Sequence, residues 1–134
     1  MNTRSIIAKK IGHGYFTSWC WTDEEPAILG DILRKYFSSV EIVDELLKYR
    51  NILGIFADYK KDVAPSVPGM YSRLSNGFYI KHDDGKDVVV SGGFNGFFRS
   101  ISDMLNEAVH FLYVFDPDNE TWIIYKKRMS VTPP

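Results

Sequence analysis

The chain has 134 residues, of which 45% are hydrophobic and 15% aromatic, so its composition is that of a globular protein rather than a disordered chain. The 16 basic and 17 acidic residues give a net charge of −1, which argues against general binding of nucleic acid through a basic stripe. The single cysteine, Cys20, excludes an intrachain disulfide and a zinc site built from several cysteines.

We expect one domain spanning residues 1–134, with a frayed tail at 130–134. The apolar run near the N-terminus is too short for the core of a signal peptide, and no stretch approaches the ~18 apolar residues of a membrane span. The sequence therefore predicts a cytoplasmic protein.

A β-hairpin is predicted at the start of the chain. Residues 4–11 and 15–21 are rich in isoleucine, tyrosine, phenylalanine and tryptophan, and the glycines between them supply a turn. Cys20 lies among apolar neighbours in the second strand and is interpreted as a buried small residue.

Two consecutive helices are predicted next. Apolar residues recur at helical spacing over residues 29–37 and again from residue 42 to about residue 49. Ser38 and Glu41 have the spacing of a capping box, which predicts that the second helix begins near Ser38.

The central segment supports fewer assignments. Residues 52–56 fit either a short strand or the end of the helical region, and two prolines and a glycine make residues 63–69 a loop. Residues 78–81 and 88–90 are predicted strands on either side of an Asp-Gly turn at 83–85.

The C-terminal part begins with a predicted short helix at 100–107, capped by Ser100 or Ser102. A hairpin with strands at 109–115 and 121–126 follows. The first of these strands is apolar on both faces, which predicts a central position in a sheet.

These elements together predict an α+β fold. We expect a single antiparallel sheet with two main helices packed on one face and a short third helix. The N-terminal and C-terminal hairpins are expected to share that sheet.

Three segments resemble a family of small proteins that is common in bacteriophages and prophages. Residues 3–8 (TRSIIA) are similar to the T-R-S-x-I-A strand of that family, and residues 19–26 (WCWTDEEP) are similar to its Y-C-H-W-D-G-Y-P segment, which leads into a G-x-x-L-x-x-x-Y helix. Tyr113, Phe115 and Trp122 resemble its C-terminal Y-x-F…W-Y hairpin. The resemblance implies a phage origin and carries no settled activity.

This chain departs from the family pattern in the second segment. Only Cys20, Asp23 and Pro26 match, and Trp21 stands where the family has a histidine. We therefore transfer no catalytic role from the family to this chain.

Three acidic residues, Asp23, Glu24 and Glu25, directly precede the first predicted helix. Paired carboxylates can serve a metal site, acid/base chemistry or an acidic partner-binding patch. Carboxylates also suit the positive end of a helix dipole, and Pro26 is tolerated in a first helical turn. We favour this structural interpretation.

A glycine-rich run at residues 92–96 precedes Arg99. Glycines let a backbone approach a ligand and an arginine supplies a fork of donors, which are the parts of an anion or nucleotide pocket. Phe94, Phe97 and Phe98 could stack on a base. The favoured alternative is a glycine-rich connection whose phenylalanines pack in the core.

No metal site and no cofactor are predicted. His82 and Asp84 could be two ligands, but Asp84 belongs to a turn that explains it. Residues 116–120 resemble the start of a calcium loop, yet Lys127 stands where the bidentate glutamate is required, so we interpret them as a hairpin turn.

The sequence contains no serine or cysteine in a recognisable nucleophile motif. We therefore expect a non-enzymatic phage accessory protein that binds stoichiometrically, either blocking a host or defence protein or sequestering a small anionic nucleotide. One alternative is a small enzyme acting on a nucleotide or nucleic acid, with Asp23, Glu24 or Glu25 as acid or base and Arg99 as anion clamp. Another is a virion structural or assembly factor.

The expected binding patch lies on the N-terminal hairpin and the start of the first helix. Trp19, Trp21, Tyr15 and Tyr49 are more large aromatics than a small core needs, and such residues anchor interfaces. A homodimer is left open. The predicted binding residues are Trp19, Trp21, Asp23, Glu24, Glu25 and Arg99.

Overall fold

The chain folds as a mixed β-sheet with three helices. The computed structural model describes residues 3–22, 26–57, 70–82, 97–107 and 109–126. Its strands are β1 (Thr3–Ile11), β2 (Gly14–Thr22), β3 (Asn51–Phe56), β4 (Met70–Arg73), β5 (Tyr79–His82), β6 (Phe97–Phe98), β7 (Phe111–Asp116) and β8 (Thr121–Lys126). Its helices are α1 (Pro26–Tyr36), α2 (Val40–Leu46) and α3 (Ile101–Leu105). None of these three helices combines the length and hydrophobicity that crossing a bilayer requires.

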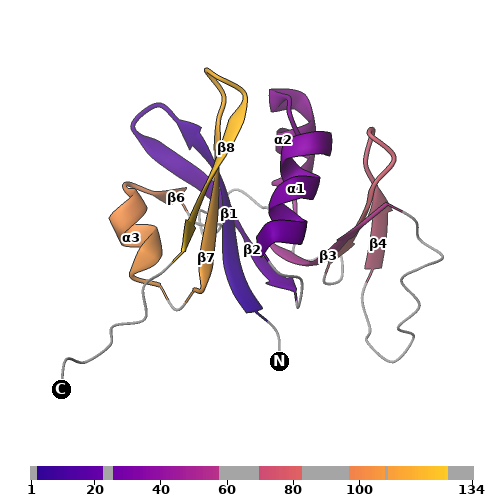
Figure 1. Cartoon of the computed structure of the whole chain (residues 1–134), viewed down its shortest axis with the longest axis horizontal. Coiled ribbons are helices and arrows are strands. Elements are labelled where there is room, and N and C mark those ends of the chain that lie inside the picture. Colours follow the sequence, from indigo (N-terminus) through magenta and orange to yellow (C-terminus); the bar gives the residue numbers. More distant parts are fainter. Residues whose placement is uncertain (1–2, 23–25, 58–69, 83–96, 108, 127–134) are drawn as a thin grey trace.

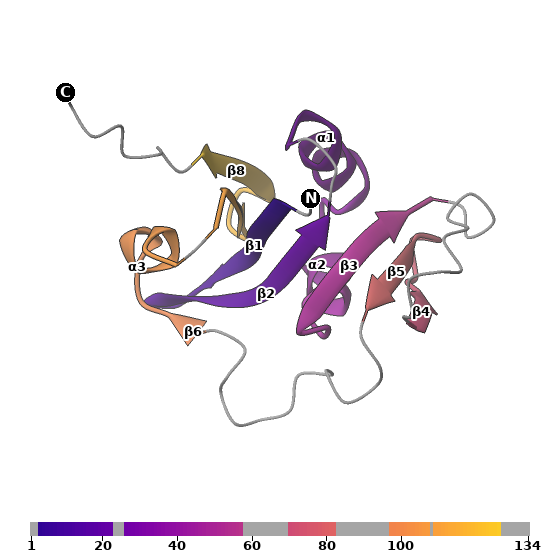
Figure 2. The same cartoon turned by 90° about the horizontal axis from the view of Figure 1, so that it is seen from below.

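The strands of the described residues join in one sheet in the order β4-β5-β3-β2-β1-β7-β8, with β6 paired to β2 (Figures 1 and 2). The β1–β7 and β2–β3 pairs are parallel, so the prediction of an all-antiparallel sheet is wrong. The helices α1 and α2 carry the chain from the end of β2 back to the start of β3, which is the crossover that parallel strands require. The two terminal hairpins share the sheet as expected, and β7 is central between β1 and β8.

The β1–β2 hairpin depends on two glycines at and beside its turn. Its turn contains Gly12 at a φ of 52°, a left-handed conformation that glycine adopts without a steric penalty. Gly14 is buried beneath the ring of Phe97, whose Cζ would lie 2.2 Å from a Cβ at that position. The close approach of β6 to β2 therefore depends on a glycine at position 14.

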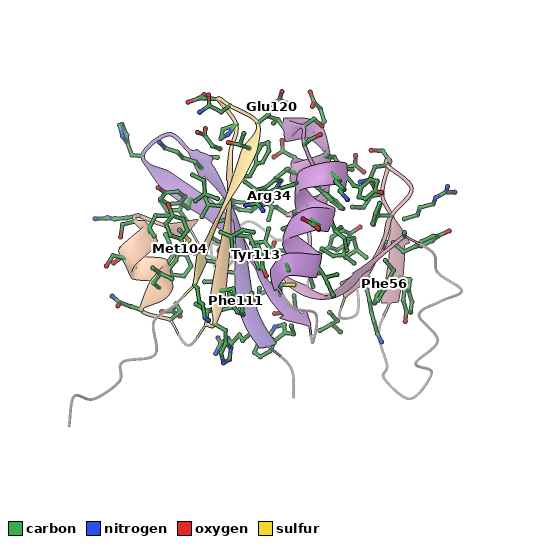
Figure 3. The ribbon with its side chains drawn as sticks, viewed as in Figure 1. Arg34, Phe56, Met104, Phe111, Tyr113 and Glu120 are labelled. Atoms are coloured by element: carbon green, nitrogen blue, oxygen red, sulfur yellow. The ribbon has the colours of Figure 1, made fainter. Side chains whose placement is uncertain are left out.

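The helices α1 and α2 lie against one side of the sheet, which we call the inner face, and the sheet bends around them (Figures 1 and 2). In Figure 3, Tyr113 lies between the strands at the left and α1. The buried core of the inner face comprises Ile7, Cys20, Leu29, Leu33, Phe37, Ile42, Val43, Leu46, Leu47, Ile52, Ile55, Leu74, Phe78, Ile80, Tyr113, Phe115 and Trp122.

Side chains from elsewhere in the chain satisfy the last carbonyl groups of α1. Asn76 Nδ2 donates to the Tyr36 carbonyl at 2.8 Å, and the buried Trp122 Nε1 donates to the Phe37 carbonyl at 2.8 Å. These bonds pair groups that a helix C-terminus leaves without intrahelical partners. At the start of α2 the cap is Ser39, whose Oγ accepts from the Ile42 N–H at 3.5 Å, so the predicted start near Ser38 is off by one residue.

The opposite side of the sheet, the outer face, carries a second core under α3. Its buried residues are Ile6, Ala8, Met104, Val109, Leu112 and Val114. Met104 projects from α3, at the left of Figure 3. The predicted short helix is therefore confirmed, and Ser100 is its cap, since its Oγ accepts from the Asp103 N–H at 3.0 Å.

Loss of this cap is expected to destabilise the protein moderately. Ser100→Ala removes the acceptor for the Asp103 N–H and should lower the free energy of unfolding by about 0.5–2 kcal/mol. Ser102→Ala, at an exposed position inside the same helix, is the matched control and should have almost no effect. Urea denaturation of both variants measures the difference. An equal loss in the two would show that the Ser100 hydroxyl is not a cap.

The central segment differs most from expectation. Residues 51–56 form a strand and not the end of the helical region, the two alternatives that the sequence left open. On its other side from β3, β5 pairs with β4, a strand that the sequence did not predict. The turn between them contains Gly77 at a φ of 90°. The predicted strand at 88–90 and the loop at 63–69 lie outside the described residues.

A carboxylate on α2 holds the β4–β5 turn in place. Glu45 Oε1 accepts from the Ser75 N–H at 2.9 Å, and its Oε2 accepts a second bond from the Ser75 hydroxyl. These bonds, the hydroxyl first, lower the pKa of Glu45 below its ordinary value of 4.5, and Lys48 contributes to a lesser extent.

Glu45 is expected to make part of the stability pH-dependent. Because its folded-state pKa is depressed, its contribution is present above the unfolded-state value near 4.5 and is lost as the pH falls through the lower folded-state value. Glu45→Gln should therefore be less stable than the wild type at neutral pH, and the difference should shrink in acid. Thermal melts from pH 7 down to about pH 3 measure this. Asp31→Asn, at an exposed carboxylate on α1, is the control, and a pH-independent gap for Glu45→Gln would contradict the assignment.

Candidate functional site

Both predicted tryptophans lie on the outer face of β2. Successive residues of a strand point to opposite faces, so Trp19 and Trp21 share one side while Cys20, between them, is buried in the inner core. Each indole is half-buried, and Trp19 also packs against the core under α3. The burial predicted for Cys20 is confirmed.

Arg4 lies between the two indoles. It is the register partner of Trp21 across the β1–β2 hairpin. Its guanidinium carbon lies 4.2 Å from the centroid of the Trp19 ring and 4.9 Å from that of Trp21. Attraction between a cation and the face of an indole is strongest where water is partly excluded, so both rings hold the guanidinium in place.

Within the described part of the chain, the Arg4 guanidinium faces the two indoles and no carboxylate. Its Nε is buried without a hydrogen-bond partner, and within the described ranges no carboxylate forms an ion pair with it. A guanidinium without an ionic partner retains its charge and its donor fork for an anion or a carbonyl group.

Asn51 completes the group from the neighbouring strand. It is the register partner of Trp19 in the parallel β2–β3 pair, and its Oδ1 accepts from Trp21 Nε1 at 3.2 Å. This bond satisfies the indole N–H and fixes the ring. We call Arg4, Trp19, Trp21 and Asn51 the tryptophan–arginine cluster.

Among the described residues, Arg99 is the predicted site residue that lies away from this cluster. Asp23, Glu24 and Glu25 lie outside the described residues. Helix α1 begins at Pro26, as a proline in a first turn allows. Arg99 is exposed beyond β6, which pairs with the first residues of β2, roughly 20 Å along the strand from Trp21 at about 3.3 Å per residue.

The aromatic residues near Arg99 divide between core and surface. Phe98 packs against the core of the outer face, whereas Phe97 is 55% exposed and covers Gly14. The core interpretation is therefore correct for Phe98 and wrong for Phe97. Phe94 and the glycine run at 92–96 lie outside the described residues, and so does the main part of the predicted anion pocket.

The other two aromatics of the predicted patch are outside the cluster, although Tyr15 packs against the same outer-face core as Trp19. Tyr15 is near the opposite end of β2, and Tyr49 stacks on His82 with ring centroids 4.4 Å apart. Of the predicted patch, the described residues bring together Trp19 and Trp21, and they add Arg4 and Asn51, which the sequence did not indicate. The register of the hairpin around Gly12 could have placed Arg4 opposite Trp21, but nothing local to Asn51 indicated its position.

A serine–histidine pair was also missed. Ser72 Oγ lies 2.9 Å from Nε2 of His82, which is the separation of a nucleophile from a base. His82 is only 4% exposed and lies beneath Tyr49. Ser72 and His82 belong to strands 70–73 and 79–82, and a nucleophile motif in one short segment would not have revealed a pair joined across two strands.

No metal site is formed by the described residues, since no three histidine, cysteine, aspartate or glutamate side chains converge there. The segment at 116–120 is a hairpin turn, as predicted. Asp116 accepts from the Asp118 N–H at 3.0 Å and from Asn119 Nδ2 at 2.9 Å, and these bonds lower its pKa. Its carboxylate is thereby engaged in turn chemistry.

No family model, curated protein or solved structure matches this chain. The tryptophan–arginine cluster is the feature of the described residues that bears most directly on function.

Proposed function

We propose that this chain is a non-enzymatic binding protein that acts stoichiometrically, and that the tryptophan–arginine cluster is the centre of its binding surface. The observation that supports the proposal is the position of Arg4 between two half-buried indoles. Tryptophan and arginine are the residue types that most often contribute large shares of binding energy.

The cluster is organised before any partner binds. The rings are attached to paired strands, Asn51 fixes the Trp21 ring, and the two indoles fix the guanidinium. Side chains already ordered in the free protein lose little entropy on association, so more of the contact energy is retained as affinity. The four side chains of the cluster favour binding over turnover, because none of them is a typical acid, base or nucleophile.

An enzyme is the second candidate, and the Ser72–His82 pair is the observation that favours it. A catalytic pair must reach its substrate, and His82 is 4% exposed. The hydrogen bond fits equally well with a polar link between β4 and β5 inside the protein. The pair therefore supports the enzyme less strongly than the cluster supports a binding protein.

The resemblance to small phage proteins extends the proposal to a biological setting. A phage accessory protein in the host cytoplasm would block a host or defence protein, or sequester an anionic nucleotide. A role in virion assembly is the remaining alternative, and copurification of the chain with intact particles would favour it.

Affinity capture with matched variants tests the proposal. Tagged wild type, Trp21→Ala and Tyr36→Ala are exposed to the same bacterial lysate, and bound proteins, nucleic acids and small molecules are all quantified. Tyr36 is 51% exposed on α1, so its variant is a control for loss of a surface aromatic. We expect one ligand to be retained by the wild type and Tyr36→Ala and lost by Trp21→Ala. Equal recovery by all three would contradict the assigned surface.

A further inference from the structure

A second group of aromatic and basic side chains continues the outer face beyond the tryptophan–arginine cluster. Its residues lie in two rows of register partners, and each row crosses the neighbouring strands β3, β5 and β4. Phe56 of β3 is opposite Tyr79 of β5, which is opposite Arg73 of β4. In the second row, Lys81 of β5 is opposite Gly54 of β3 on one side and Tyr71 of β4 on the other. We call Phe56, Tyr71, Arg73, Tyr79 and Lys81 the tyrosine patch.

The patch pairs each cation with a ring. The guanidinium carbon of Arg73 lies 5.9 Å from the Tyr79 centroid, and Lys81 Nζ lies 5.6 Å from the Tyr71 centroid. The three rings are half-buried and Arg73 is exposed, whereas Lys81 is buried, with 5% of its surface exposed. A ligand that stacks on Tyr79 therefore also meets the positive charge of the exposed Arg73.

Gly54 lets the ring of Phe56 lie along the sheet. A Cβ at Gly54 would be 2.3 Å from Phe56 Cζ, so the ring folds back over the glycine instead of standing out from the strand. A β-bulge between Ile52 and Gly54 accompanies this arrangement. In Figure 3, Phe56 lies on the β3–β4 side of the molecule, away from Met104 on α3.

Charge is distributed unevenly over the fold. Strands β1 to β5 contain no aspartate or glutamate. The acidic residues of the described segments lie on the three helices, in the segment after α3 and around the β7–β8 turn: Asp31, Glu41, Asp44, Glu45, Asp103, Glu107, Asp116, Asp118 and Glu120. Among the described residues, strands β1 to β5 therefore carry basic but no acidic side chains.

We propose that the tyrosine patch and the tryptophan–arginine cluster together form a binding platform for single-stranded nucleic acid. This inference rests on the proposed binding function and names its ligand class. Aromatic rings on a sheet stack on unpaired bases, and neighbouring arginines and lysines contact the phosphates. The combination of five half-buried rings, two arginines (Arg4 and Arg73) and strands without a carboxylate fits that chemistry.

The dimensions favour a strand of several nucleotides over a single nucleotide. The rings stand on four adjacent strands, β2, β3, β5 and β4, which span about 14 Å at ~4.8 Å per spacing. Stacking positions on separate strands suit successive bases of one chain, whereas a mononucleotide would occupy one of them. A duplex would be a poor ligand, because its base faces are already stacked on one another.

Fluorescence anisotropy of the full chain with labelled oligothymidylate and oligouridylate of about ten nucleotides tests this inference and separates DNA from RNA. We expect at least one of the two to bind, and to bind about tenfold or more tightly than a duplex of equal length. Tyr71→Ala and Arg73→Ala should each weaken binding about fivefold or more. Tyr36→Ala and Arg34→Ala, at exposed positions on α1, are the matched controls and should not weaken it.

The outcomes that overturn the inference are distinct. The inference fails if neither oligonucleotide changes its anisotropy up to ~100 μM protein, or if both patch variants bind as tightly as the wild type. It also fails if the chain binds a duplex, or thymidine monophosphate, as tightly as it binds the oligonucleotide. Arg73→Glu, at an exposed position, keeps the test valid if Tyr71→Ala fails to fold. If no oligonucleotide binds but affinity capture yields a protein that Trp21→Ala loses, the proposed binding function stands and this inference fails.

Discussion

Leu33→Ala is expected to lower the free energy of unfolding by ~2–5 kcal/mol. Leu33 is fully buried in α1 and belongs to the core between the helices and the inner face of the sheet. Truncation removes apolar contacts and leaves a cavity that the surrounding sheet can only partly fill. Leu46→Ala, at a fully buried position in α2, should show a loss in the same range.

Urea denaturation followed by circular dichroism measures both losses. Ile28→Ala is the matched control, because Ile28 lies on the same helix as Leu33 but is 52% exposed, and its loss should stay within about 0.5 kcal/mol. Losses below half a kcal/mol at both Leu33 and Leu46 would contradict the placement of the two helices over the sheet.

Trp21→Ala is expected to have the largest effect on function. The variant lacks the ring whose centroid lies 4.9 Å from the guanidinium carbon of Arg4, and it lacks the Nε1 donor that lies 3.2 Å from Asn51 Oδ1. Both the contact surface of the indole and the groups that orient Arg4 and Asn51 are therefore lost. Truncation of a central interface tryptophan typically costs about 2 kcal/mol or more, which corresponds to a roughly 30-fold weaker Kd.

Isothermal titration of the captured ligand measures this change. A thermal melt establishes that Trp21→Ala is folded, and Trp21→Phe, which keeps a ring but not the N–H, should lie between the alanine variant and the wild type. Tyr36→Ala should bind like the wild type. An unchanged Kd for a folded Trp21→Ala would remove the cluster from the binding surface.

Local signals predicted most of the individual elements. The apolar stripes of α1 and α2, the glycine turn of the first hairpin and the serine before α3 each act through residues close together in the chain. The two parallel pairings could not be predicted in this way, because they depend on where the long connections bring β3 and β7. Likewise, β4 is only four residues long and has little periodicity to detect.

Two of the four residues of the tryptophan–arginine cluster were predicted from the sequence. Trp19 and Trp21 were identified, together with Tyr15 and Tyr49, because these are more large aromatics than a small core needs. Arg4 and Asn51 were missed because their role comes from register across three strands. The tyrosine patch was missed for the same reason, since its cations and rings meet through the pairing of β5 with β3 and β4.

The ratio of chain to ligand at saturation tests the central claim most directly. The captured ligand is held constant, the amount of chain is varied, and the effect on the ligand's activity or availability is followed over time. We expect the effect to saturate at about one chain per binding site and to stay constant thereafter, as binding through a single preformed surface requires. Complete, time-dependent loss of the ligand's activity at a small fraction of that ratio would show turnover and contradict a stoichiometric binding protein.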